Sequence, residues 1–421
     1  MNIWIFNHYA ISPGSSGITR DYDLAKRLLN KGHQVTIFAS SFDHRSRKEK
    51  HFDNPKGLFK EEYHNGIRYV WVRTTPYHSN SIKRVFNILS YTIRGYIASK
   101  KVSGSPDVVM GTLVHPLAAF LGYLVSKHKK SLFYFEERDL WPETLVHLGK
   151  FSKRNPVVYL LSKLELFLYK KSKRIIVLFD KAPKYVEQRG ISIDKVLYIP
   201  NGVDLETYQR REELSAEVTT VLDKLQGKFL AIYTGAHGLA NRLDLILDAA
   251  KDVQEKNEDI HFLFVGDGVE KNALQERKNH EDIDNVTFMD PIPKEQIPSL
   301  LSRANVGLIA MWDAELYKWG MSLNKAYDYM AAKIPTIIQC NIDDTIIEKS
   351  GGGLKVPDAN GVAEALEYLY KHPKEAEVMG IKARDYVEKY HSWEQMSETL
   401  IRAIEEDVNH EPKDMKEREF V

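Results

Sequence analysis

The sequence predicts an α/β protein with two doubly wound domains that face a central cleft. The chain has 421 residues, too many for a single hydrophobic core. Apolar segments alternate with segments of helical spacing, and several apolar runs are nearly continuous, which is typical of a parallel sheet covered on both faces. The segment YIPNGVDLETY (198–208) interrupts this alternation with Pro, Asn and Gly. We therefore expect domains over 1–200 and 201–390, with a last helix and a charged tail over 391–421.

The first domain begins with the strand-like segment NIWIF and a helix over 19–32, whose leucines share one face and which Gly32 ends. Further strands are expected at 33–39, 67–73, 107–111, 131–137 and 174–179, and helices near 81–101, 115–129 and 155–171. Residues 43–65 are polar and rich in turn formers, so we expect a long excursion there.

The second domain repeats the plan. Strands are expected at 229–235, 260–266, 285–290, 306–311 and 336–340, and helices at 242–256, 270–280, 294–304 and near 323–333. No short-period internal repeat is visible in the sequence.

Composition excludes several classes of protein. The single cysteine, Cys340, excludes an internal disulfide framework and a cysteine-rich metal site, which suits a reducing cytoplasm. The first residues lack the basic and apolar regions of a signal peptide. No stretch reaches the roughly 18 apolar residues of a membrane-spanning helix. We therefore expect a cytoplasmic protein.

Charge is divided between the two halves. Residues 1–200 hold 33 Lys and Arg against 16 Asp and Glu, whereas 201–421 hold 26 against 42. This asymmetry indicates that the first half faces an anionic partner, and nucleic acid and an anionic membrane surface are both candidates. A basic surface that is simply solvated explains the same numbers. Nucleic acid ranks last, because no recognition motif accompanies the basic residues.

Ligands of doubly wound sheets bind outside the carboxyl ends of the strands, so we collected the residues there. Three glycine-bearing loops follow strands. The loop 13–19 places Gly14 and Gly17 before a helix, where backbone N–H groups favour an anion, although a plain tight turn fits equally well. It lacks the G-x-G-x-x-G dinucleotide fingerprint.

The other two loops lie in the second domain. Residues 235–242 contain Gly235, His237 and, in the expected first helical turn, Arg242. A cation there opposes the helix dipole, so Arg242 makes sense beside a bound phosphate, although a solvated arginine is equally consistent. Asp267 and Gly268 follow the next strand and could face a ribose or base, or simply form a helix cap.

Charged residues crowd one strand end of the first domain: Glu136, Glu137, Arg138 and Asp139. Charges there are costly to bury unless they are paired or used, so we consider this cluster functional. His115 follows another strand and is a candidate catalytic residue, although a lone histidine is more often a capping or packing residue.

The helix near 323–333 carries the strongest signal. Its N-terminal amides lie around Ser322 to Lys325 at the expected cleft, and Leu323 and Asn324 belong to that turn. Lys325 suits a diphosphate, and Asp328, three residues on, can accept a hydrogen bond from a ribose hydroxyl. A helix that only packs would favour an acid, not a lysine, in its first turn.

These motifs together resemble the retaining glycosyltransferases of the GT-B fold, in the large family four. The segments that carry the resemblance, over about residues 1–400, are PGSSG, IPNGVD, YTGAHG, FLFVGDG, NVTFMDPIPKEQ and NKAYDYMAA. ERDLWPE and SLNKAYDYMAA resemble the subgroup that builds bacterial surface polysaccharides, including N-acetylfucosamine-type sugar transferases.

The resemblance implies transfer of a sugar from a nucleotide diphosphate, with UDP favoured, to an acceptor with retention at the anomeric carbon, normally without a metal or other cofactor. The second domain would hold the donor, and the first, near Glu137 and Arg138, the acceptor. Gly17 would meet the diphosphate, and Asp139 and His115 would contact donor sugar or acceptor. The last helix would cross back to the first domain.

Two motifs depart from the family pattern. Its two glutamates fall on Gly320 and Asp328, so one acid is missing and the other is shortened. Its usual Arg and Lys fall near Ala236 and Asn241, and we expect Lys325 and Arg242 to compensate. These departures keep two alternatives open: a nucleotide-sugar epimerase on the same fold and a non-catalytic nucleotide-sugar-binding relative.

The acceptor suggests a use for the basic first domain. Residues 81–101 and 159–174 mix apolar with basic side chains, and such helices can lie on anionic lipid, although ordinary sheet-covering helices look the same. A polyprenyl-diphosphate-linked acceptor would place the protein on the inner face of the cell membrane. A saccharide is the other acceptor we expect.

Overall fold

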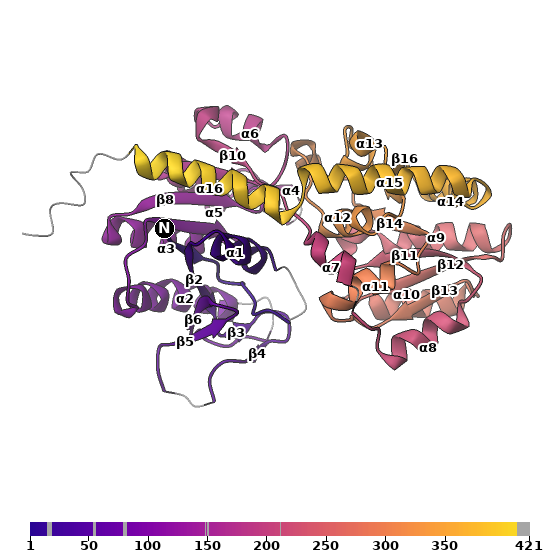
Figure 1. The fold of residues 1–421 in the computed structure, drawn as a ribbon, viewed down its shortest axis with the longest axis horizontal. Helices are drawn as coiled ribbons and strands as arrows, with labels where there is room; N and C mark the ends of the chain where they lie inside the picture. Colours follow the sequence, from indigo (N-terminus) through magenta and orange to yellow (C-terminus); the bar gives the residue numbers. More distant parts are fainter. Residues whose placement is uncertain are drawn as a thin grey trace, which may run out of the picture.

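A computed structural model describes residues 1–14, 19–53, 56–78, 82–147, 149, 151–210 and 212–410. Figure 1 shows two α/β domains side by side, with the last helix, α16 (Trp393–Asn409), lying over the first domain. The predicted fold class is confirmed: each domain is a sheet of mainly parallel strands with helices on both faces. In the described residues no helix is both long and apolar enough to cross a membrane.

The first domain contains an eight-stranded sheet in the order β10-β9-β8-β7-β1-β2-β6-β5. Its strands are β1 Asn2–Phe6, β2 Gln34–Ser40, β5 Phe59–His64, β6 Ile67–Val72, β7 Val108–Leu113, β8 Leu132–Glu137, β9 Arg174–Val177 and β10 Val196–Tyr198. All neighbours pair in parallel except β5 and β6. The strand order reverses between β1 and β7, which is where such sheets bind ligands.

The segment 43–65 differs from the long excursion that we expected. It holds part of a short hairpin, β3 (Phe42–Asp43) and β4 (Lys48–Glu49), and the edge strand β5. The sequence of β5 is FKEEYH, and its side chains are half-buried or exposed because an edge strand covers little of the core. A search of the sequence for continuous apolar segments therefore misses β5.

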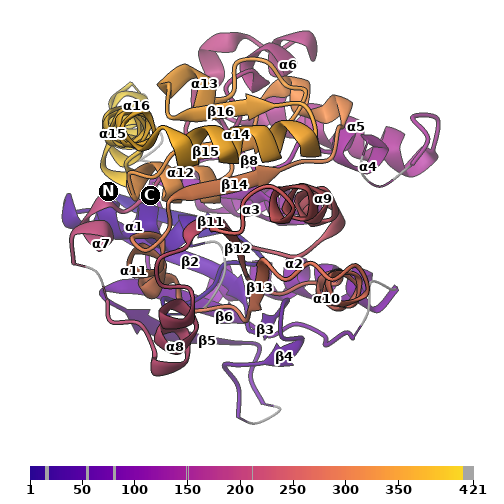
Figure 2. The same cartoon turned by 90° about the vertical axis from the view of Figure 1, so that its right-hand side faces the viewer.

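The second domain contains a six-stranded, fully parallel sheet in the order β13-β12-β11-β14-β15-β16. Its strands are β11 Phe229–Thr234, β12 Ile260–Val265, β13 Val286–Met289, β14 Val306–Ala310, β15 Thr336–Gln339 and β16 Gly353–Val356. Helices cover both faces and bury two separate hydrophobic clusters (Figure 2). The order reverses between β11 and β14.

The helices follow the strands in alternation. Those of the first domain are α1 Arg20–Asn30, α2 Ile82–Lys101, α3 Pro116–Lys129, α4 Glu143–His147, α5 Pro156–Lys171 and α6 Ala182–Gln188, with the 3₁₀ turn η1 Ile193–Lys195. Those that follow are α7 Leu205–Arg210, α8 Ala216–Lys224, α9 Leu243–Gln254, α10 Lys271–His280, α11 Ile297–Leu301, α12 Asn324–Ala331, α13 Ile346–Ser350, α14 Ala359–Lys371 and α15 Pro373–Tyr390, with the 3₁₀ turns η2 Leu239–Asn241, η3 Lys294–Gln296 and η4 Glu315–Trp319.

Two chain segments connect the domains, and they are bonded to each other. The Val203 N–H donates to the His391 carbonyl at 3.0 Å, and the Trp393 N–H donates to the Val203 carbonyl at 3.2 Å. Beyond this point α16 packs on α1 and inserts Trp393, Met396, Leu400 and Ile404 into the core of the first domain. The two connections therefore form one hinge.

Candidate functional site

The candidate site lies at the carboxyl ends of β11, β12 and β14 in the second domain, beside the N-terminus of α12. Helix α12 begins at Asn324, and the side chain of its N-cap, Leu323, makes no capping hydrogen bond. Helix N-terminal amides without a capping group are ready to bind an anion. Asn324 is exposed and Lys325 is half-buried, so this first turn is open to solvent.

Lys325 is the central cation of the site. Its Nζ donates to the Tyr233 hydroxyl at 3.0 Å and to Asn241 Oδ1 at 2.7 Å, and it lies 4.3 Å from the centre of the Tyr233 ring. It pairs with no carboxylate of the described residues. Burial without a counter-charge lowers the pKa of Lys325 to about 7. Binding of an anion would restore the ordinary protonated state.

Asn241 lies near the position at which the resembled transferases carry a lysine. Its side-chain oxygen accepts a hydrogen bond from Lys325, so an ammonium group reaches this loop from α12. Compensation by Lys325 for the missing lysine stays a prediction.

Two glycine loops cross tightly beside Lys325. Gly235 has a φ of 141°, and a Cβ built on it would lie 3.5 Å from Lys325 Cε. A Cβ on Gly268 would lie 2.3 Å from the His237 carbonyl oxygen, so a side chain there would displace the neighbouring backbone. The His237 N–H donates to the Asp267 carbonyl at 2.9 Å. Gly268 is thus required for the close approach of the two loops, and a glycine is favoured at 235 by its positive φ.

His237 itself is fully buried, and neither ring nitrogen has a hydrogen-bond partner in the described residues. Burial and the nearby Lys271 lower its pKa to about 4, so the ring is neutral at physiological pH. Asp267 and Gly268, by contrast, are exposed, and the Gly268 N–H donates to Asp267 Oδ1 at 2.8 Å. The exposed residues Asp267 and Gly268 and the buried imidazole of His237 therefore belong to the same pair of loops.

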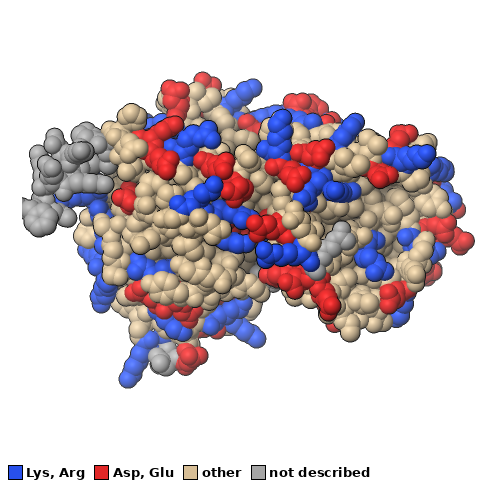
Figure 3. Space-filling model, in the orientation of Figure 1, with Lys and Arg blue, Asp and Glu red and all other residues tan. Residues whose placement is uncertain are grey.

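Asp328 lies one turn along α12 from Lys325. Its Oδ1 accepts a hydrogen bond from the Tyr208 hydroxyl at 2.8 Å, and burial raises its pKa. Lys294, from the loop after β13, lies near enough to favour the ionised form of Asp328, and it also bonds Asp23 of α1 at 3.2 Å. The acid is thus held at the junction of the two domains, where charged side chains of both signs gather (Figure 3).

Arg242 is not placed with Lys325. It adopts a left-handed backbone conformation (φ 43°) as the N-cap of α9, and its guanidinium bonds Asp244 at 3.1 Å and lies over Trp312. The pair with Asp244 supplies the counter-charge that we expected from a phosphate. Trp312 is half exposed and Val269 is 86% exposed, so both present apolar surface near these strand ends.

In the first domain the cluster at the end of β8 divides between two faces. Glu136 accepts from Arg20 Nε at 2.9 Å and from the Thr112 hydroxyl at 2.9 Å, and both carboxylate and guanidinium are buried. Arg138 donates to Asp21 at 3.1 Å. These residues form a buried charged network beneath the domain junction.

Glu137 faces the opposite side and is corrected from an acceptor-binding to a core position. It is fully buried, accepts from the Tyr169 hydroxyl, and has a pKa raised well above its usual value by burial and by Glu165. Successive strand residues point to opposite faces, so Glu136 and Glu137 cannot both line one surface. Asp139 follows the end of the strand and is exposed. Partial desolvation by the surrounding protein raises the pKa of its carboxyl group.

The structure gives His115 a capping role in place of the expected catalytic one. Its Nδ1 accepts from the Ala118 N–H at 3.2 Å as the N-cap of α3, and its Nε2 lies 2.7 Å from His8 Nδ1. Both ring nitrogens are occupied, and burial lowers its pKa to about 3. The His8–His115 pair marks the point where the strand order of the first sheet reverses. Gly17 lies outside the described residues.

Family models match both domains. "Glycosyltransferase Family 4" matches residues 21–207 and "Glycosyl transferases group 1" matches residues 228–372, so together they cover more than three quarters of the chain. The chain is a glycosyltransferase with the GT-B fold. No curated protein sequence matches this glycosyltransferase at a significant level.

Solved structures share the fold over nearly the whole length. Sucrose-phosphate synthase from Thermosynechococcus elongatus matches with a TM-score of 0.73 at 16% identity, over 97% of this chain and 100% of that one. Anabaena HepE in complex with UDP matches at 0.67 and 10% identity, over 96% and 100%. WaaG, a glycosyltransferase involved in lipopolysaccharide biosynthesis, matches at 0.64 and 12%, over 96% and 99%. At these identities the likeness shows the fold alone.

The missing family acid of this glycosyltransferase, at Gly320, has a steric explanation. Gly320 has a φ of 96°, and a Cβ built on it would lie 2.0 Å from Asp180 Oδ1 of the first domain. Asp180 in turn pairs with Lys349 of α13. In this arrangement of the domains the position is used for close interdomain contact, and a side chain there would require Asp180 to move.

Restoring the acid should therefore destabilise the glycosyltransferase. We expect Gly320→Glu to cost about 1–3 kcal/mol in backbone strain, and more from the overlap with Asp180, measured by urea unfolding. Gly227→Glu is the matched control, because Gly227 has a φ of 87° but nothing within 4 Å of its built Cβ. Equal losses of stability in the two variants would contradict the steric role of Asp180.

Sequence reasoning missed three of the site's residues, Tyr233, Tyr208 and His8, and it named Asn241 only as a departure from the family pattern. Tyr233 and Asn241 hold Lys325, Tyr208 holds Asp328, and His8 pairs with His115. Asn241 and His8 follow strands and could have been found by the strand-end criterion. Tyr233 is part of an apolar strand, and Tyr208 lies in the interdomain segment, so neither carries a local signal.

Proposed function

We propose that this glycosyltransferase transfers a sugar, with retention, from a UDP-sugar to a saccharide or polyprenyl-diphosphate-linked acceptor in the synthesis of a surface polysaccharide. The resemblance of ERDLWPE and SLNKAYDYMAA supports an N-acetylfucosamine-type donor sugar. HepE, which shares the fold, was solved with UDP, and WaaG acts in lipopolysaccharide biosynthesis, which supports the donor and the setting.

The observation that carries the proposal is Lys325. A half-buried ammonium without a carboxylate partner stands at an uncapped helix N-terminus, at the point where the strand order reverses. A leaving diphosphate supplies the missing negative charge, and preorganised amides and a cation stabilise charge that develops on it. Charge neutralisation by Lys325 and α12 is the basis for proposing transfer without a metal.

The remaining residues have defined tasks in this proposal. Asp328, held by Tyr208, accepts a hydrogen bond from the ribose, and Asp267 and Gly268 line the site of the base. Asp139 contacts the sugar or the acceptor, because it is the exposed acid at the end of β8. The leaving phosphate takes the acceptor proton, since His115 has no free nitrogen.

The experiment is a thermal-shift screen of UDP- and GDP-sugars, followed by transfer assays with saccharide and polyprenyl-diphosphate acceptors in the presence of EDTA. We expect UDP-sugars to raise Tm and sugar transfer to persist with EDTA. Absence of any nucleotide binding at millimolar concentration would overturn the proposal. Epimer formation without an acceptor would favour an epimerase instead.

A non-catalytic nucleotide-sugar-binding relative is the second candidate, because Gly320 removes the acid that contacts the donor sugar in the resembled family. It predicts the same UDP-sugar binding as the first candidate. Binding without transfer to any acceptor, and without hydrolysis of the donor, would decide in its favour.

The first domain exposes an apolar and basic surface that suits a lipid-linked acceptor. Helices α2 and α5 both pack against α3 and expose large apolar side chains: Ile82, Val85, Phe86, Leu89, Ile93, Val157, Tyr159 and Leu160. Exposed lysines accompany them at Lys83, Lys100, Lys101, Lys163, Lys170 and Lys171. We propose that this surface, α2 with α5, rests on the anionic inner face of the cell membrane.

This surface predicts reversible binding to anionic vesicles. The double variant Phe86→Glu/Leu160→Glu should lose most of the binding measured by vesicle co-sedimentation, and added salt should weaken wild-type binding, because each basic residue contributes about 1 kcal/mol near the surface. Val378→Glu on α15 is the control, since Val378 is similarly exposed but lies in the second domain's last helix. Equal binding to neutral and anionic vesicles would contradict the proposal.

A further inference from the structure

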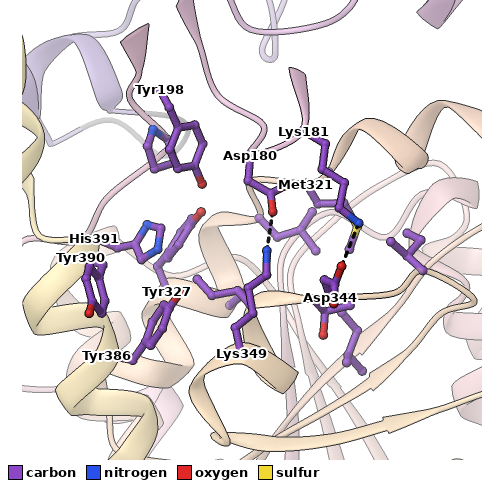
Figure 4. A pocket seen from close by; sticks show the side chains of 18 of the residues that line it. Asp180, Lys181, Tyr198, Met321, Tyr327, Asp344, Lys349, Tyr386, Tyr390 and His391 are labelled. Carbon is purple, nitrogen blue, oxygen red and sulfur yellow. Dashed lines mark hydrogen bonds and ion pairs between the residues drawn. The ribbon is translucent and has the colours of Figure 1, made fainter. Parts of the chain in front are cut away.

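A cavity lies at the hinge between the domains, next to the N-terminus of α12 (Figure 4). Its volume is about 260 Å³. Its walls come from the first domain, from the segment around α12 and α13, and from the end of α15. The lining includes Asp180, Tyr198, Tyr327, Ile342, Tyr386 and His391. Both chain segments that connect the domains border it, because Pro200 and His391 line it.

The cavity and the candidate site both border α12. Gly320, Leu323, Ala326 and Tyr327 line the cavity. Lys325 and Asp328 do not line it, and their partners Tyr233, Asn241 and Tyr208 do not line it either. A molecule in the cavity would therefore contact the N-cap of α12 without contacting Lys325 or Asp328.

The lining has a mixed chemistry that selects a ligand class. Tyr198, Tyr327, Tyr386 and Tyr390 present aromatic rings around His391 (Figure 4). His391 is 5% exposed, its Nδ1 has no hydrogen-bond partner in the described residues, and burial lowers its pKa to about 4. A buried neutral imidazole with an unpaired nitrogen can form a hydrogen bond with a polar group of a ligand.

The charges at the cavity are already paired. Lys349 pairs with Asp180, and Lys181 bonds the Asp343 carbonyl at 3.1 Å and Asp344 at 3.4 Å. These pairs leave no spare cation for a diphosphate, whereas hydroxyl groups can both donate to the carboxylates and accept from the lysines. Aromatic walls with polar groups at the ends match a ring that has an apolar face and hydroxyls at its rim.

We propose that this hinge cavity binds one neutral sugar ring, either a free monosaccharide or one residue of a glycan, and that occupancy stabilises the arrangement of the domains described here. The cavity takes a single ring because it lies below the volume range of ordinary drug-sized sites. Its walls belong to both domains, so rotation about the hinge would change its shape. The coupling rests on the proposed function: a ligand that stabilises this arrangement must, by linkage, raise the affinity for a donor that prefers the same arrangement.

The test is a titration with glucose, N-acetylglucosamine and fucose, followed by saturation-transfer NMR and thermal shift. We expect millimolar binding that persists in Lys325→Ala and in the presence of saturating UDP. Ile342→Trp, which fills the cavity, and Tyr390→Ala, which removes one aromatic wall, should each weaken it about tenfold. Val378→Trp is the control for the tryptophan, because Val378 is exposed elsewhere on α15.

The coupling has its own measurement. Saturating sugar should raise UDP affinity fivefold or more in the wild type and leave it unchanged in Ile342→Trp. Failure of every sugar to bind, or displacement of sugar by UDP, would overturn the proposal. Preferential binding of p-cresol, an aromatic compound without the ring of hydroxyls of a sugar, would also overturn it. Sugar binding itself does not depend on the proposed transfer reaction, since Lys325→Ala weakens the donor site and Lys325 does not line the hinge cavity.

Discussion

Lys325→Met should weaken UDP binding about 30- to 150-fold. Hydrogen bonds between a charged group and its partner contribute about 2–3 kcal/mol, and tenfold in affinity corresponds to 1.4 kcal/mol. Methionine keeps the length and the packing of the stem but removes the ammonium group and its bonds to Tyr233 and Asn241. Isothermal titration calorimetry with UDP measures the effect, and Lys318→Met, at an exposed lysine of η4, is the matched control.

The pH dependence of binding tests the same residue independently. The pKa of Lys325 is about 7 without ligand, and a bound diphosphate favours the protonated form and so raises that pKa. Above pH 7 the free enzyme loses the proton, so wild-type affinity should fall by up to tenfold per pH unit. Below pH 7 the lysine is already charged, and this contribution is constant. Calorimetry in buffers of different ionisation enthalpy should show proton uptake at pH 8.

Lys325→Met should also change the free energy of unfolding without ligand, and this change should favour the folded variant although its UDP binding is weaker. The pKa of Lys325 is lower in the folded chain than in the unfolded chain, so the unfolded state binds more protons between pH 7 and about 10. Wild-type stability therefore gains from this group as pH rises through that window, and Lys325→Met lacks that gain. At pH 7 and below the unliganded variant should be more stable than wild type, as expected when a functional site is not optimised for stability. A pH-independent UDP affinity in the wild type would contradict the assignment of Lys325.

The fold was predictable because its signals are local. Central parallel strands are continuous apolar runs, and each of those runs named from the sequence is a strand of one of the two sheets. The edge strand β5 was missed because its side chains are half-buried or exposed, so residues 43–65 contain no continuous apolar run. Register and strand order depend on contacts between distant segments and came only from the structure.

The candidate site was predictable where function depends on position along the chain. Lys325 and Asp328 follow a strand and lie near the start of a helix, so their positions in the sequence already place them beside the strand ends, and their roles in donor binding stay predictions. The bond between Arg242 and Asp244 came only from the structure, because strand-end reasoning does not consider a neighbouring acid. Glu137 failed for a simpler reason: adjacent residues of a strand face opposite ways, and the period of two in β8 already separates it from Glu136.

Arg20→Ala should be the most destabilising single substitution among those considered. Arg20 is 2% exposed; its Nε donates to Glu136 at 2.9 Å, and its two terminal nitrogens donate to the carbonyls of Pro200 at 2.6 Å and Ile199 at 2.8 Å. Truncation leaves the Glu136 carboxylate and two backbone carbonyls of the hinge without these donors. Removal of one partner of a buried ion pair costs about 3–5 kcal/mol.

The measurement separates loss of charge from loss of the hinge contacts. Urea unfolding should show the loss in Arg20→Ala, and Arg20→Lys should recover only part of it, because an ammonium group cannot reach Glu136 and both carbonyls in the fork geometry of a guanidinium. The double variant Arg20→Met/Glu136→Gln removes both charges and should be more stable than Arg20→Ala, since no unpaired charge stays buried. If Arg20→Ala instead unfolds at the wild-type urea concentration, the hinge does not depend on this guanidinium, and other contacts, such as the bonded connections at Val203 and His391 and the pair of Lys294 with Asp23, must hold the domains.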